Sequence, residues 1–261
     1  MDKRIRSLAI NITDICNMEC AFCLRGDRGT RKMDLSLIPR IFEGITQVDC
    51  ITVTGGEPSC YVEAVTAIAD YIVEHQKDLM VYGFFIVTNA KEYRQELVDA
   101  VKKVWMLLLE KCYFGDRIVG FKEVRTYSSI LEEMHYEFGI AVSLDEYHEP
   151  IDTMNYFKYR LSGIYSDAKE TDFSKGGVIA RGRGEGLPNS HYRSYYDLTV
   201  EVDEESVDAE EVYVTVDGKV FADCDMSYDM EASNEPAGDL HEETLAEIMQ
   251  RYADELMAED E

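Results

Sequence analysis

The hydrophobic residues in the first two thirds of the chain indicate a series of strands. Leu8, Ile10 and Ile12 alternate with small or polar residues, and this period of two predicts a β-strand. Residues 81–88 are apolar almost throughout, as is typical of a strand buried in a parallel sheet. Shorter apolar segments predict further strands at residues 50–54, 139–144 and 176–180.

The segments between these strands have the period of a helix. Ile38, Ile41, Phe42 and Ile45 are spaced as on one helix face, for which Ser36 is the expected N-cap. Similar spacing predicts helices around residues 65–72, 97–104, 130–138 and 155–164. Because strands alternate with helices, the sequence predicts an α/β fold with a parallel sheet and right-handed crossovers.

The alternation stops near residue 187. Residues 211–222 contain an Asp217-Gly218 pair between two short apolar segments, which is typical of a β-hairpin. A last helix is expected from Glu242, with an apolar face formed by Leu245, Ile248, Met249 and Tyr252. We therefore expect a main domain of residues 1–187 and a small C-terminal extension of residues 188–261.

Three cysteines follow the first predicted strand, at Cys16, Cys20 and Cys23. Thiolate sulfur is a soft ligand that suits iron–sulfur clusters and zinc. A [4Fe–4S] cluster is usually held by four cysteines, so three would leave one iron free to bind a reactant. A structural zinc site needs four protein ligands, and the sequence has no second cysteine pair downstream.

The spacing Cys16-x-x-x-Cys20-x-x-Cys23, with the aromatic Phe22 before the last cysteine, resembles the signature of the radical S-adenosylmethionine (radical SAM) superfamily. Residues 54–58, Thr-Gly-Gly-Glu-Pro, resemble a second motif of that family. The resemblance implies a partial (β/α)6 TIM-like barrel whose cysteines bind a [4Fe–4S] cluster. It also implies that S-adenosylmethionine binds the open iron and is cleaved reductively to a 5′-deoxyadenosyl radical, which takes a hydrogen atom from a substrate.

The resemblance assigns a role to the glycine-rich motif. Gly55, Gly56 and Glu57 would hold the methionine ammonium, since glycines allow close approach and a carboxylate suits an ammonium. An isolated Gly-Gly pair would otherwise indicate a turn. Phe22 is included among the residues expected to bind the cofactor.

Polar residues at other strand ends are weaker candidates for cofactor binding. Ser143 and Asp145 match a position that often contacts the ribose or the methionine carboxylate, and the alternative is a helix cap or turn. Asn89 is a candidate ribose contact. Arg181 or Arg183 could pair with the methionine carboxylate, the alternative being solvated loop arginines.

Two further residues lie on the expected catalytic face of the barrel. Tyr147 and His148 follow a predicted strand and are candidates to donate a hydrogen atom or a proton to the substrate. The alternative is a packed Tyr-His pair with a structural role.

The C-terminal extension resembles a reduced form of the SPASM or twitch region of peptide-modifying radical SAM enzymes. That region normally carries several cysteines, whereas the extension carries only Cys224. We therefore expect one cluster per chain, with Cys224 packed as a small apolar side chain. Cys50, Cys60 and Cys112 are expected to be buried small residues as well.

The charge of the chain limits its partners. The 261 residues include 26 basic and 52 acidic ones, a formal net charge of −26, which disfavours nucleic acid as a partner. The charged N-terminus is not a signal peptide, and no apolar run is long enough to cross a membrane. Seven cysteines without a secretory signal favour a reducing, cytoplasmic location.

Three functions remain open at this point. The C-terminal extension favours a radical SAM enzyme that modifies a peptide or protein side chain. The short chain and the missing second cluster favour one that acts on a small metabolite. The third alternative is a non-catalytic iron–sulfur or zinc protein. For either enzyme, we expect a low-potential electron donor such as flavodoxin or ferredoxin.

Overall fold

The computed structural model describes residues 1–109, 138–143, 148–165, 178–188 and 190–259. Asp145, Tyr147 and Cys112 lie outside the described residues. Of the helix predicted at residues 130–138, only Phe138 is described, and it begins a strand.

One mixed sheet, nine-stranded in the described part of the chain, forms the centre of the molecule. Its main path is β11-β10-β9-β1-β2-β4-β5, with β3 beside β2 and β8 beside β9. The strands are β1 (Asp2–Asn11), β2 (Gln47–Thr54), β3 (Met80–Val81), β4 (Phe84–Thr88), β5 (Phe138–Val142), β8 (Val200–Val202), β9 (Ser206–Val214), β10 (Lys219–Phe221) and β11 (Gly238–Asp239). The pairs of β1 with β2 and β9, and of β4 with β2 and β5, are parallel, which confirms the predicted α/β fold with a mostly parallel sheet.

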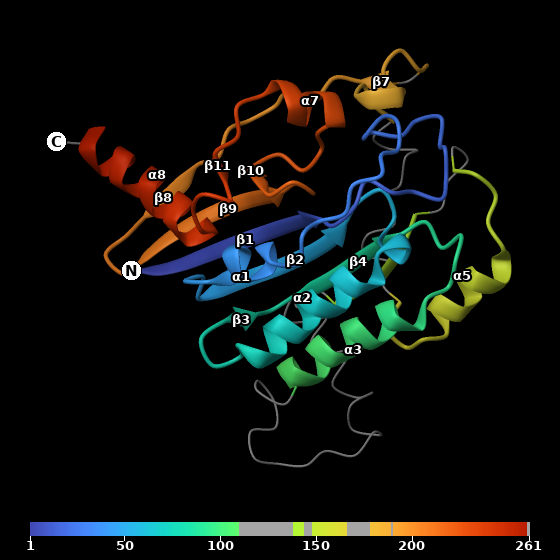
Figure 1. Ribbon diagram of the computed structural model, residues 1–261, viewed down its shortest axis with the longest axis horizontal. Helices are drawn as coiled ribbons and strands as arrows, with labels where there is room; N and C mark the ends of the chain where they lie inside the picture. Colours follow the sequence, from blue (N-terminus) through green and yellow to red (C-terminus); the bar gives the residue numbers. More distant parts are fainter. Residues whose placement is uncertain (110–137, 144–147, 166–177, 189, 260–261) are drawn as a thin grey trace.

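The helices predicted near residues 38–45, 65–72 and 97–104 and after residue 242 bury their apolar faces, whereas the one predicted at residues 155–164 ends at Arg160 and buries only Tyr159. The longer ones are α2 (Val62–Glu74), α3 (Gln95–Leu109) and α8 (Leu245–Glu259), and the shorter ones are α1 (Leu37–Phe42), α5 (Thr153–Arg160) and α7 (Tyr228–Ser233). In α2 the buried face includes Val65, Ile68, Ala69 and Ile72. Figure 1 shows α1, α2 and α3 covering one face of the sheet, while α7 lies near the end toward which β1 points. No helix among the described residues is long and apolar enough to cross a membrane.

Two local predictions are corrected. Ser36 precedes α1 but makes no capping hydrogen bond through its side chain. Instead, its N–H donates to Asp34 Oδ1 at 2.9 Å, because an aspartate readily bonds the backbone two residues on. The strand predicted at residues 81–88 is two strands, β3 and β4, which pair with different parts of β2.

The C-terminal extension continues the main sheet. β9 runs parallel to β1, and β10 returns antiparallel to β9 as the predicted hairpin. Gly218 in the turn has φ +82°, a conformation that glycine adopts without strain. A second, two-stranded parallel sheet consists of β6 (Val178–Ile179) and β7 (Ser190–His191), and a short 3₁₀ turn, η4 (Gly182–Gly184), lies between them in sequence. The boundary at residue 187 stays a prediction.

Candidate cluster and cofactor site

The three cysteines lie in a loop of residues 12–33, which we call the cysteine loop. It begins where β1 ends, at the edge of the sheet where parallel α/β folds carry their reactive groups. Its two ends are joined by a hydrogen bond from Met33 N–H to Ile12 O (2.9 Å) and by a bridge between Thr13 and Lys32. The loop is therefore closed at its base and projects from the sheet as one unit.

The three thiols face a common space. Cys16, Cys20 and Cys23 are each half-buried and line a small cavity of about 50 Å³. The Met18 N–H donates to Cys16 Sγ at 3.4 Å. Burial is the main cause that raises the pKa of Cys16 to about 11, and burial also raises the pKa of Cys20. A bound metal would instead lower the pKa of these thiols, because its positive charge stabilises a thiolate.

The geometry of these thiols can be compared with two kinds of metal site. No group of three or more His, Cys, Asp or Glu side chains in the described ranges is close enough to hold a single metal ion. In a cubane cluster each thiolate binds a different iron, so the sulfur atoms need not converge on one point. Three half-buried thiols around one cavity fit such a cluster, with Cys16, Cys20 and Cys23 as its ligands.

The Gly-Gly-Glu segment after β2 is bonded to the cysteine loop. Gly56 N–H donates to Thr13 O (2.6 Å), and Glu57 N–H donates to Ile15 O (2.9 Å). A Cβ atom on Gly56 would lie 2.5 Å from Ile15 O, and one on Gly55 would lie 2.7 Å from Thr13 O. The glycines are thus required by the close approach of the protein's own backbone. Both also line the cavity of the three thiols.

Glu57 is a fully buried carboxylate. Its Oε1 accepts from Thr88 Oγ1 (2.6 Å) and from Ser59 N–H (3.0 Å), and its Oε2 accepts from Asn89 N–H (2.8 Å). Burial raises the pKa of Glu57, and these hydrogen bonds oppose that effect. A carboxylate offers about four acceptor positions, so about one remains. Within the described part of the chain, Glu57 forms no ion pair.

The ends of β4 and β5 add polar groups beside the cysteine loop. Asn89 Nδ2 donates to Asn17 Oδ1 at 2.8 Å and lies 3.8 Å from Cys16 Sγ. Ser143 is bonded to the end of β4 through its N–H and Thr88 O (2.9 Å). The structure therefore brings the end of β4, and with it Asn89, to the first of the three cysteines.

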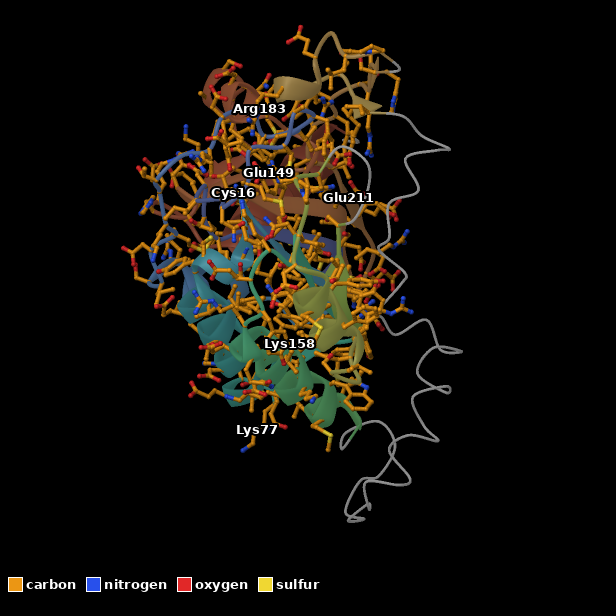
Figure 2. All side chains as sticks on the ribbon, turned by 90° about the vertical axis from the view of Figure 1, so that its right-hand side faces the viewer. Cys16, Lys77, Glu149, Lys158, Arg183 and Glu211 are labelled. Carbon is orange, nitrogen blue, oxygen red and sulfur yellow. The ribbon has the colours of Figure 1, made fainter. Side chains whose placement is uncertain are left out.

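His148 and Phe22 pack against each other. Their rings are edge to face, with centroids 4.8 Å apart, so the segment after β5 reaches the cysteine loop. Glu149 strengthens this contact, since it accepts from the Glu19 N–H (2.7 Å) and from Lys91 Nζ (2.8 Å). Figure 2 shows Glu149 and Cys16 close together, away from Lys77 and Lys158.

Arg181 does not lie at the cysteine cavity. Its guanidinium is buried and donates to Asp223 Oδ2 (2.9 Å), to Arg193 O (2.8 Å) and to the carbonyl of Asp225. These bonds tie the segment after β6 to the extension. Arg183 is the arginine of this segment that lines the cavity of the three thiols. Its Nε is buried without a hydrogen bond, and the nearest carboxylate oxygen, Asp27 Oδ1, is 3.9 Å away.

Several residues of this cavity were not expected from the sequence, among them Asp14, Arg25 and Tyr228. Arg25 is buried and contacts Glu231, 206 positions later in the chain. Tyr228 comes from the extension, where nothing in the sequence points toward the cysteines. Arg25 follows Cys23 by two residues, and this position could have suggested that it lies near the thiols.

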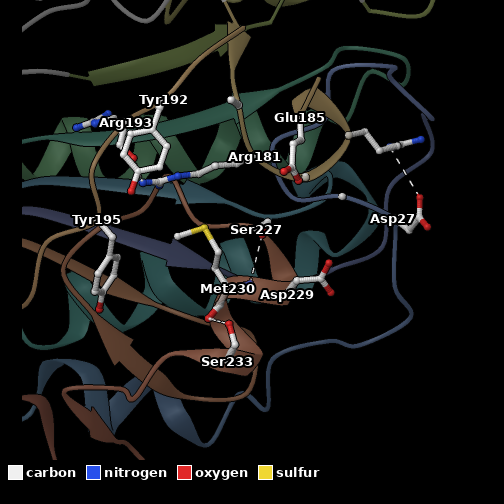
Figure 3. Close-up of a pocket in the computed structure, with 14 residues that line it drawn as sticks. Asp27, Arg181, Glu185, Tyr192, Arg193, Tyr195, Ser227, Asp229, Met230 and Ser233 are labelled. Carbon is white, nitrogen blue, oxygen red and sulfur yellow. Dashed lines mark hydrogen bonds and ion pairs between the residues drawn. The ribbon is translucent and has the colours of Figure 1, made fainter. Parts of the chain in front are cut away.

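A larger cavity adjoins the first. It has a volume of about 520 Å³ and lies between the segment after β6 and helix α7 (Figure 3). The two cavities share Gly26 and Arg183. Asp229 and Met230 of the extension form part of its wall, with Tyr192 and others. A molecule in the larger cavity would therefore lie next to the cysteine cavity.

The family model of the radical SAM superfamily matches residues 10–109. Residues 10–109 are therefore similar to a radical SAM domain. The matched residues include the cysteine loop, the Gly-Gly-Glu segment and Asn89, which are the parts that meet around the thiols.

Individual relatives are distant. An uncharacterized protein of Methanocaldococcus jannaschii is 22% identical over 103 residues, which cover 38% of this chain and 36% of that protein. The structure of Streptococcus suis SuiB bound to the precursor peptide SuiA is 14% identical, with a TM-score of 0.43. This match covers 93% of this chain and 64% of SuiB. The structure of anSMEcpe with bound AdoMet and a peptide is 14% identical, with a TM-score of 0.42, and the match covers 95% of this chain and 80% of that one.

Proposed function

We propose that this radical SAM protein reductively cleaves S-adenosylmethionine at a [4Fe–4S] cluster bound by Cys16, Cys20 and Cys23. When bound and reduced, the cluster would supply the electron that cleaves S-adenosylmethionine, and the 5′-deoxyadenosyl radical would take a hydrogen atom from the substrate. Glu57 carries the proposal. A buried carboxylate without a cationic partner is costly, and a ligand ammonium would provide that partner.

The chain's own residues would bind and orient the cofactor. Glu57 would accept a hydrogen bond from the methionine ammonium at its remaining acceptor position. Arg183, whose Nε lacks a hydrogen bond, is better placed than Arg181 to pair with the methionine carboxylate. Asn89 and Ser143 would contact the ribose. Asp145, Tyr147, His148 and Phe22 remain candidates for the roles that the family resemblance implies.

The substrate is proposed to be a peptide or protein side chain in the larger cavity. The extension forms part of that cavity, and its hairpin and helix are the features that resemble peptide-modifying relatives. A small metabolite is the second candidate, because about 520 Å³ lies within the usual range of small-molecule sites, roughly 300–1,000 Å³. The proposed electron donor is a low-potential protein such as flavodoxin or ferredoxin.

The cleavage reaction can be tested without knowing the substrate. Anaerobically reconstituted protein, given dithionite and S-adenosylmethionine, should form 5′-deoxyadenosine, which mass spectrometry detects. Cys20→Ala should bind less iron and form none, whereas Cys50→Ala, a cysteine on β2, should behave as the wild type. A wild-type protein that is fully loaded with cluster and forms no 5′-deoxyadenosine would rule out this function.

A further inference from the structure

Arg25 links the cysteine loop to the C-terminal extension. It follows Cys23 by two residues, lines the cavity of the three thiols and is buried. Its Nη1 donates to Met226 O at 2.8 Å and to Glu231 Oε1 at 3.2 Å. The guanidinium carbon lies 4.8 Å from the centre of the Tyr213 ring. All of these partners belong to the extension.

The extension encloses this ion pair. Glu231 on α7 is only 5% exposed, and Tyr213 Oη donates to its Oε1 at 2.6 Å. Asn11, at the end of β1, donates to Tyr213 Oη at 3.1 Å. The Tyr228 N–H donates to Arg25 O at 3.0 Å, so the backbone beside Arg25 is fixed as well. Because both charges are buried, solvent and salt screen them little.

We propose that Glu231 offsets the positive charge of Arg25 beside a cluster held by Cys16, Cys20 and Cys23, so that Arg25 does not raise the reduction potential of that cluster. The inference rests on the proposed function, since it requires that cluster. Reduction adds one electron from an external donor, so the reduced cluster is the more negative form. A nearby positive charge stabilises that form and raises the potential, whereas a nearby negative charge lowers it. In the intact pair the two charges largely offset each other.

The proposal predicts that the two single variants shift the reduction potential in opposite directions. Arg25→Gln leaves the negative charge of Glu231 and should move the potential to a more negative value. Glu231→Gln leaves the positive charge of Arg25 and should move it to a more positive value. The double variant removes both charges and should return close to the wild type. A purely structural role would instead damage cluster binding in both single variants.

The experiment is a redox titration of the anaerobically reconstituted full chain, with dithionite and mediators, monitored by electron paramagnetic resonance. It is run at pH 8, because burial raises the pKa of Glu231, against the opposing effect of Arg25 and the Tyr213 hydroxyl, and an alkaline pH favours the ionised carboxylate. Arg6 and Glu210 form the matched control, because they are an exposed ion pair between β1 and β9. Arg6→Gln and Glu210→Gln should leave the potential unchanged.

Each outcome has a distinct meaning. Shifts of opposite sign, cancelled in the double variant, would establish the proposal. Loaded variants with unchanged potentials, or with shifts of the same sign, would overturn it. If a single variant does not bind iron, the double variant and the charge-conserving Arg25→Lys decide the question. Both should have a reduction potential close to that of the wild type. A wild-type protein that forms no cluster would overturn the proposed function itself.

Discussion

At the scale of single residues, the site depends on which polar groups already have partners. Glu57 accepts hydrogen bonds from three donors and has no cation beside it in the described part of the chain, which is why we propose it as the partner of the methionine ammonium. Arg181 is the opposite case, because Asp223 and two carbonyls occupy its guanidinium. The sequence offered both residues as candidates, but only the three-dimensional contacts show that Arg181 already has its partners within the protein.

Replacing the Glu57 carboxylate by an amide tests its role. We expect Glu57→Gln to weaken S-adenosylmethionine binding by roughly ten- to a hundredfold, since a charge-assisted hydrogen bond contributes about 1.5–3 kcal/mol. The cluster should stay bound, because Glu57 is not one of its ligands. Equilibrium dialysis of the reconstituted protein measures the affinity, and iron analysis checks the loading.

The control for this prediction is Glu63→Gln, which makes the same change on the exposed surface of α2. Its affinity should equal that of the wild type. If Glu57→Gln also binds S-adenosylmethionine as tightly as the wild type, then Glu57 is not the partner of the ammonium.

At the scale of elements, the site is the meeting of two strand ends. The cysteine loop continues β1, the Gly-Gly-Glu segment continues β2, and the parallel register of the two strands places them side by side. Alternating and apolar segments predicted these strands, and the parallel sheet implied that their ends meet. The sequence could not reveal that Gly55 and Gly56 are needed for backbone packing, because a glycine pair alone does not identify its neighbour.

An alanine at Gly56 should separate these two elements. Its Cβ would lie 2.5 Å from Ile15 O and 2.7 Å from Asp14 O, both backbone atoms of the cysteine loop. We expect Gly56→Ala to lower the free energy of unfolding by about 1–3 kcal/mol, as overpacking does, and to reduce the iron content. Denaturant unfolding and iron analysis measure the two effects.

Gly186→Ala is the control for this prediction, because it introduces backbone strain without close packing. Gly186 has φ +77°, and no atom lies within 4 Å of the Cβ position, so alanine there strains only its own backbone. This substitution should lower the free energy of unfolding by about 1–3 kcal/mol and leave the iron content unchanged. Full iron content in Gly56→Ala would mean that the close packing of the two segments is not required for the cluster.

At the scale of the whole molecule, the C-terminal segment is joined to the part of the chain that carries the cysteine loop. β9 pairs with β1 along most of its length, and α7 reaches Arg25 in the cysteine loop. The hairpin and the last helix could be predicted, because a turn pair and an amphipathic period are local signals. The pairing of β9 with β1 could not be predicted, since contacts between residues about two hundred positions apart leave no local pattern.

Cys224 lies in this extension, and replacing it tests whether the extension carries a second cluster. Its side chain packs on a small apolar group that includes Tyr213, Phe221 and Met226, and burial raises its pKa to about 11. Since a further cluster would need several thiolates, we expect one cluster per chain, with about four irons and four sulfides. Iron and sulfide analysis should give the same values for the wild type and for Cys224→Ala, while Cys20→Ala falls below both. An iron content of about eight per chain, or a loss of iron in Cys224→Ala, would instead assign the extension a second cluster and a role in electron transfer.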